Sequence, residues 1–148
     1  MTELRALTLF EPWASLLAHG HKRYETRPRR ISYRGPVAIH AAKTWPKEAE
    51  DVCLSLAAAP TFLSAGFRLP DLHQGCIVGV GELVDVHPAA AVRDGLSQQE
   101  RYFGWYDTGR WAWEFRDLRP LREPIPCRGM QGLWIARDLE PAILAQLV

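Results

Sequence analysis

The stretch GCIVGVGELVDVH, Gly75 to His87, is the clearest strand of the sequence, and we expect the fold to be built around it. Within it, Ile77 and Leu83 share one face with Gly79 and Gly81, because successive side chains of a strand point to opposite faces. Glycine inside a strand indicates a sharp bend or the close approach of another backbone. The corners of small barrels show both features, so we expect this strand to be central in a β-barrel.

Shorter elements precede and follow this strand. Hydrophobic runs bounded by proline or glycine predict five further strands, at Arg5–Phe10, Lys22–Arg27, Val37–Ala42, Arg110–Leu118 and Gly132–Ala136. Helical spacing and a proline at the start predict helices at Pro12–His19, Pro46–Ala58 and Pro141–Val148. The order of elements contains no βαβ repeat, which argues against a doubly wound sheet. We therefore predict one α+β domain over residues 1–148, a small mixed or antiparallel barrel of five or six strands with two or three flanking helices.

The connecting segments differ in character. Ala59–Gln74 is expected to be a loop or a short helix, and Pro88–Tyr106 is a polar insertion that we expect to be partly helical. Pro120–Pro126 has a proline at each end, which predicts an extended link between strands.

The composition is that of a soluble globular protein, with 47% hydrophobic and 24% charged residues in a chain of 148. Cys53, Cys76 and Cys127 are far apart and form no CxxC pair, which favours a reducing compartment over a disulfide framework or a zinc site. The longest uncharged run, Val52–Phe67, is too short to span a membrane. The sequence contains no P-loop, GxGxxG, GxSxG or HExxH motif. We expect a cytoplasmic protein without membrane contact, metal or cofactor.

Basic residues are concentrated in the stretch GHKRYETRPRRISYRGPVAIHAAK, Gly20 to Lys43. Seven bases and one acid give it a net charge of +6, whereas the whole chain carries +1. A local cluster of this kind attracts phosphate even in a nearly neutral protein. We predict a positive patch beside a cleft, made by Arg23, Arg29, Arg30, Arg34 and Lys43.

The single acid of this stretch is Glu25, with Arg23 and Arg27 two residues away on either side. On a strand these three side chains share a face, so the carboxylate should stay ionised and keep a fixed orientation. Lys22 precedes Glu25 by three residues and could activate a water, hold an oxyanion or contact a phosphate. We predict that Lys22, Glu25 and Arg27 converge on one pocket; the alternative is an ion pair on a surface strand.

Aromatic and histidine side chains supply further candidates. Trp13 and Trp113 could line a pocket and stack on a base, although tryptophan more often belongs to the core. His40 lies on a strand position that faces either a cleft or the core.

Four stretches of the chain resemble the ASCH domain family of the PUA-like superfamily: EPWASLLAHGHKRYETR, YRGPVAIHAAK, GCIVGVGELVD and PIPCRGMQGLW. The family signature GxKxxExR is present as Gly20, Lys22, Glu25 and Arg27. The resemblance implies a PUA-like β-barrel whose cleft holds RNA, DNA or a modified nucleoside, with the signature residues at its floor.

The resemblance also implies candidate activities. One relative is an amidohydrolase that removes acetyl from N4-acetylcytidine with a lysine, a threonine and a glutamate, and others resemble ribonucleases or nucleic-acid-binding modules. The lysine corresponds to Lys22, the glutamate is matched to Glu100, and the threonine position holds Glu25. Thr26 is adjacent, but on a strand it would face the other side.

Three functions follow from these observations. The first is a nucleic-acid-binding module, for RNA in the first place, with a pocket for one base and contacts from Trp13, Arg23, Arg27, Arg34, His40, Lys43 and Trp113. The second is a hydrolase acting on a modified nucleoside or on RNA, with Lys22 and Glu25 as the catalytic pair and His40 assisting. The third is an interaction module without a nucleic-acid role.

Overall fold

The computed structural model describes residues 4–49, 51 and 72–147 of the chain. Six strands form one sheet in the order β2-β5-β4-β3-β1-β6, so the glycine-containing strand β4 is central as predicted. β1 and β3 are parallel, and all other neighbours are antiparallel. The strands are β1 Arg5–Leu9, β2 Tyr24–Arg27, β3 Gly35–Ala41, β4 Cys76–Pro88, β5 Trp111–Pro126 and β6 Leu133–Ile135. This mixed, curled sheet confirms the predicted α+β barrel-like fold.

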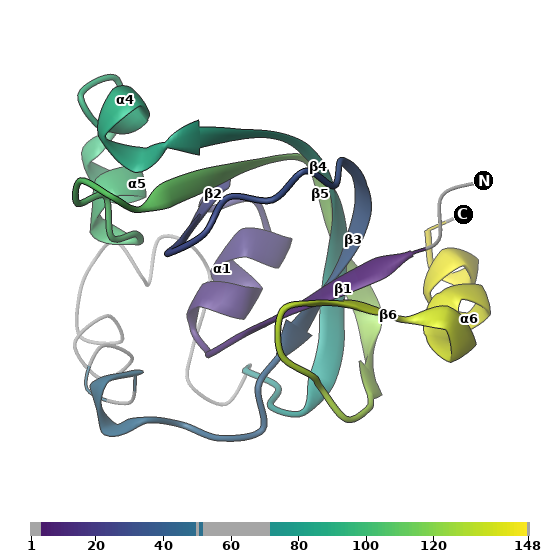
Figure 1. Cartoon of the computed structure of the whole chain (residues 1–148). Coiled ribbons are helices and arrows are strands. Elements are labelled where there is room, and N and C mark those ends of the chain that lie inside the picture. The colour runs from purple at the N-terminus through teal and green to yellow at the C-terminus, as the bar shows by residue number, and fades with distance from the viewer. Residues whose placement is uncertain (1–3, 50, 52–71, 148) are drawn as a thin grey trace.

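Helix α1, Trp13–Ala18, occupies the concave face of the curled sheet (Figure 1) and contacts β1, β3, β4 and β5. Gly79 lies directly under it. A Cβ added there would be 2.5 Å from the Cβ of Ala18 and 2.8 Å from the carbonyl oxygen of Arg119. The pairing of β4 with β5 also shifts register after Ile77, which bends the strand. Both effects expected of a strand glycine, bending and close approach, therefore occur at this position.

Both faces of β3 and of the first half of β4 are largely buried. Leu17 of α1 packs on one side with Ile39 and Phe115. Ile143 of helix α6, Glu140–Ala145, packs on the other side with Ile77. Ile77 therefore does not share a face with Gly79 and Leu83 as predicted, because the register shift after Ile77 interrupts the alternation of the strand. Burial on both faces explains why β3 and β4 carry small and apolar residues at successive positions.

The insertion between β4 and β5 carries two short helices, α4 Ala89–Arg93 and α5 Gln98–Tyr102, as its predicted partly helical character indicated. A 3₁₀ helix, Arg137–Leu139, precedes α6. The predicted Pro120–Pro126 link is extended, but the prediction that it is separate from the preceding strand is wrong, because β5 continues through it in pairing with β4. Of the predicted helix Pro46–Ala58, residues 47–49 and 51 are helical, and the remainder lies outside the described residues, as does most of Ala59–Gln74.

No helix in the described part of the chain combines the length and the apolarity needed to cross a membrane.

Candidate functional site

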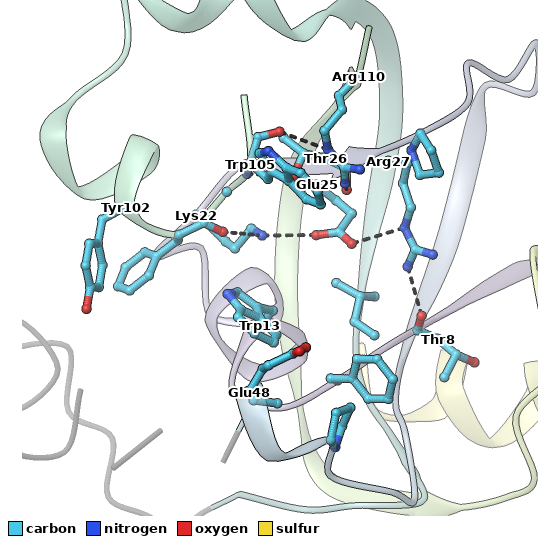
Figure 2. A pocket seen from close by; sticks show the side chains of 17 residues that line it. Thr8, Trp13, Lys22, Glu25, Thr26, Arg27, Glu48, Tyr102, Trp105 and Arg110 are labelled. Carbon is cyan, nitrogen blue, oxygen red and sulfur yellow. Dashed lines mark hydrogen bonds and ion pairs between the residues drawn. The ribbon is translucent and has the colours of Figure 1, made fainter. Parts of the chain in front are cut away.

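A cavity of about 470 Å³, the first cavity, opens where segments far apart in the sequence meet (Figure 2). Its walls come from the β1–α1 connection, from β2, from the helical residues near Glu48 and from the loop that follows α5. The charged residues Lys22, Glu25 and Arg27 line it, together with Trp13. The structure thus brings together the three residues that the sequence placed in one pocket.

The turn after α1 delivers Lys22 to this cavity. Gly20 adopts a φ of +77°, and the backbone N–H of His21 donates to the carbonyl oxygen of Leu16 over 2.9 Å. Glycine reaches this left-handed conformation without the steric cost that a Cβ imposes. The reversed chain directs the Lys22 side chain inward, and only 1% of it is exposed. It is therefore a residue of the cavity floor and not of its rim.

Glu25 connects two cations, and Figure 2 shows the resulting chain of interactions across the floor. The Nζ of Lys22 donates to Oε1 of Glu25 over 3.0 Å, and the Nε of Arg27 donates to Oε2 over 3.1 Å. Arg27 also donates from Nη2 to the backbone oxygen of Thr8 over 2.9 Å, and Lys22 donates to the backbone oxygen of Phe103 over 2.9 Å. We call these three side chains the Lys22–Glu25–Arg27 cluster.

The charges around Glu25 determine its protonation state. Burial by itself raises the pKa of this carboxyl, but the positive charges of Lys22 and Arg27 and their hydrogen bonds outweigh burial and hold the pKa below its ordinary value. Glu25 is therefore an ionised acceptor at neutral pH, in a side chain that is only 12% exposed.

The α4–α5 insertion is attached to β2 and closes one side of the first cavity. The backbone N–H of Trp105 donates to Oγ1 of Thr26 over 2.9 Å, and Oε1 of Glu100 accepts from the backbone N–H of Arg23 over 2.8 Å. Burial raises the pKa of Glu100, although the hydrogen bond from Arg23 and the charge of Lys22 oppose the rise. Thr26 points to the face of β2 opposite to Glu25, and its bond to Trp105 holds the loop that forms this wall of the first cavity.

Exposed aromatic rings gather around the opening of the first cavity. Phe10, Tyr102 and Trp105 line it and are 41%, 60% and 58% exposed. The guanidinium of Arg110 lies 4.2 Å from the centre of the Trp105 ring and donates to the backbone oxygen of Thr26. Phe103 and Trp105 are functional candidates that the sequence pattern did not predict, although the run YFGW within a polar insertion was an available signal.

His40 and Lys43 line a different hollow, a second cavity of about 800 Å³. The buried His40 ring is bonded at both nitrogens: Nε2 to the backbone oxygen of Cys127 over 3.0 Å and Nδ1 to Oγ1 of Thr8 over 3.2 Å. A carbonyl only accepts, so Nε2 carries the hydrogen and Nδ1 of the neutral ring accepts from the hydroxyl of Thr8. Burial lowers the pKa of His40, which agrees with this neutral form.

Other predicted site residues lie away from both cavities. Trp113 is 5% exposed within the core and donates from Nε1 to the backbone oxygen of Arg29 over 3.0 Å. Arg34 is exposed and lies 3.5 Å from Asp85. Arg23 is also exposed, and β2 begins only at Tyr24, so the expected bracket of Glu25 by two arginines is replaced by Lys22 and Arg27.

Among the described residues, one group has the spacing of metal ligands: Asp85, His87 and Glu114. Nε2 of His87 lies 2.8 Å from Oε1 of Glu114. Arg34 and Arg116 each lie 3.5 Å from one of the two carboxylates. The described contacts are those of a surface ion network.

Comparison with known proteins places the chain in a family. The ASCH domain model matches residues 7–125. The crystal structure of ASCH from Zymomonas mobilis matches with a TM-score of 0.55 at 21% identity, covering 98% of this chain and 95% of that one. Two single-residue mutants of that protein match at 20% and 18% identity, with TM-scores of 0.55 and 0.56, covering 98% and 97% of this chain and 96% and 98% of theirs. The search of curated proteins gave no match. At these identities the structures support the fold, while the family model covers most of the chain: the protein belongs to the ASCH domain family.

Proposed function

We propose that the protein binds single-stranded nucleic acid, RNA in the first place, and takes one base into the first cavity. A volume of about 470 Å³ lies within the range of small-molecule sites, about 300 to 1,000 Å³, and leaves room for a base with its sugar. The cavity combines aromatic walls with a few fixed polar groups, which is the usual composition of a site that orients a planar ligand.

The observation that carries this proposal is the ionised Glu25 held between two cations on the cavity floor. In a site for phosphate, a carboxylate at the centre would repel the negatively charged ligand and weaken its binding. A carboxylate has about four lone-pair positions, so Glu25 can accept another hydrogen bond beyond those from Lys22 and Arg27. Acidic side chains accept from the amino group of cytosine, and Arg27 keeps N–H groups for a neighbouring base carbonyl.

Aromatic stacking and nearby cations supply the rest of the binding energy. A base stacked on an aromatic side chain contributes about 1 to 3 kcal/mol, and Trp13, Tyr102 and Trp105 are available at the first cavity. Arg29 and Arg30 are exposed just beyond Pro28, which lines the cavity, and can reach phosphates of a bound strand.

The test is an anisotropy titration of fluorescent single-stranded RNA at several salt concentrations, with single-stranded DNA of the same sequence in parallel. Binding that weakens as salt rises, with a defined stoichiometry, is the expected result. The absence of binding at low salt would contradict the proposal and favour an interaction module.

A second candidate, a hydrolase acting on a modified nucleoside or on RNA, has one specific observation in its favour. The buried Lys22 lies 3.0 Å from Glu25, and both line the cavity. Glu25 would take a proton from a water that attacks an N4-acetyl carbonyl, and Lys22 would stabilise the oxyanion. The protonated Glu25 would then give this proton to N4 as the C–N bond breaks, releasing acetate and cytidine. Incubation with N4-acetylcytidine and with RNA, followed by chromatography, decides between turnover and binding alone.

A further inference from the structure

The first and the second cavity share one lining residue, Thr8. The backbone oxygen of Thr8 accepts from Arg27 on the first side. The hydroxyl of the same residue bonds His40 and accepts from the indole N–H of Trp134 on the second side.

The walls of the second cavity are held in place by hydrogen bonds between three chain segments. The backbone N–H of Gly75 donates to Ala41, and that of Cys127 donates to the oxygen of Gly75, over 2.8 and 3.0 Å. A Cβ added at Gly129 would be 2.5 Å from Cε1 of His40 and 2.8 Å from Oγ1 of Thr8. The backbone at Gly129 therefore packs directly on these two side chains, and the cavity is organised before any ligand arrives.

The chemistry of the second cavity differs from that of the first. Among the described residues that line it, the charged ones are Lys43 and Arg128, both exposed, and none is acidic. Thr44, Gln74 and Gln131 add hydroxyl and amide donors. The first cavity, in contrast, contains Glu25 and Glu48. A cavity with cations and neutral donors suits an anion, and basic side chains are the usual partners of phosphate.

We propose that the second cavity binds the phosphate and sugar of the nucleotide adjacent to the one whose base occupies the first cavity. This inference rests on the function proposed above and extends it: the smallest complete ligand is a dinucleotide, which crosses Thr8 between the two cavities. A free nucleoside fills only the first cavity.

The first test removes the two cations. The variant Lys43→Ala/Arg128→Ala is compared with the unaltered protein and with Arg116→Ala/Arg122→Ala, which removes two exposed charges of β5 that line neither cavity. We expect the first variant to bind a short single-stranded RNA about tenfold more weakly, with the salt slope reduced by about 1.4 for two lost contacts. Its affinity for a free nucleoside should not change. The control should keep the slope of the unaltered protein.

The second test locates the ligand through Cys127, a free and half-buried thiol that lines the second cavity. Alkylation is measured for each cysteine by peptide mass spectrometry, and Cys76, which lines neither cavity, is the internal reference. A dinucleotide should slow alkylation of Cys127 relative to Cys76, whereas a nucleoside should not.

The outcomes separate this inference from the function on which it rests. If the unaltered protein binds RNA but Lys43→Ala/Arg128→Ala keeps its affinity and salt slope, the second cavity is not a phosphate site and the base-binding proposal stands. Equal alkylation of Cys127 with nucleoside and dinucleotide would overturn the inference in the same way. If the unaltered protein binds no RNA, both proposals fall.

Discussion

At the scale of single residues, Lys22 is the most deeply buried charge of the Lys22–Glu25–Arg27 cluster. Its ammonium group is buried and donates to Glu25 and to the backbone oxygen of Phe103. Lys22→Met keeps the length of the side chain but leaves both acceptors without their donor. Because removal of one partner from a buried pair costs about 3 to 5 kcal/mol, we expect a loss of about 3 kcal/mol in the free energy of unfolding.

Chemical denaturation measures this loss, and Lys43→Met is the matched control, because Lys43 is exposed. The control should stay within about 0.5 kcal/mol of the unaltered protein. Equal stability of the two variants would show that Lys22 behaves as a solvated surface residue.

The lowered pKa of Glu25 predicts a specific dependence of stability on pH. A carboxyl whose pKa is lower in the folded state contributes stability that is present above its unfolded pKa and is lost as pH falls through the folded value. The unfolded value is near 4.5, and the folded value lies below it. The difference in unfolding free energy between the unaltered protein and Glu25→Gln should therefore be constant from pH 8 to about pH 5 and should shrink below about pH 4.5. A difference that persists unchanged at low pH would contradict an ionised Glu25.

At the scale of elements, the packing of α1 on β4 depends on Gly79. A methyl group there would meet Ala18 at 2.5 Å and the backbone oxygen of Arg119 at 2.8 Å, and backbone atoms move less easily than side-chain ends. We expect Gly79→Ala to destabilise the protein by about 2 to 3 kcal/mol through overpacking. Gly95→Ala is the control, since its nearest neighbour would be at 3.8 Å. A well-tolerated Gly79→Ala would mean that α1 can move away from the sheet.

The attachment of the α4–α5 insertion to β2 can be tested through Thr26. Thr26→Val removes the acceptor for the backbone N–H of Trp105. Hydrogen exchange at the Trp105 amide should become at least about fivefold faster, which corresponds to about 1 kcal/mol of lost protection. Thr44→Val, at an exposed residue of the second cavity, should leave that rate unchanged. Unchanged exchange in Thr26→Val would show that other contacts hold the insertion.

At the scale of the whole molecule, the local sequence pattern was sufficient for some features and not for others. The central place of β4 followed from the glycines within its apolar run. The convergence of Lys22 with Glu25 followed from short-range spacing, because the two residues are three positions apart and one glycine turn precedes them. The wall around Phe103 and Glu100 could not be predicted, because its contacts to Lys22 and Arg23 join residues 81 and 77 positions apart. His40 and Lys43 were expected with the cluster but lie across Thr8, since pairing of β1 with β3 assigns them to another hollow.

The charge distribution of the molecule predicts how binding depends on salt. Arg29 and Arg30 are exposed beside the first cavity, whereas the protein as a whole carries only +1. If each contacts one phosphate of a single strand, Arg29→Ala/Arg30→Ala should lower the salt slope by about 1.4. The base preference should not change, because phosphate contacts carry no sequence information. An unchanged salt slope would show that Arg29 and Arg30 do not contact phosphates of the bound strand.

In the complex that we propose, Glu25 accepts a hydrogen bond from the amino group of a bound base. The decisive experiment compares the affinities for two short RNAs that differ in one cytosine-to-uracil exchange, for the unaltered protein, Glu25→Gln and Glu48→Gln. Glu48 lines the same cavity outside the Lys22–Glu25–Arg27 cluster and is the matched charge control. We predict a preference for cytosine of about tenfold, from the 1 to 3 kcal/mol of one good base contact, that Glu48→Gln keeps and Glu25→Gln loses. Equal affinity for both RNAs in the unaltered protein, or a preference that survives in Glu25→Gln, would contradict a hydrogen bond from the base to Glu25.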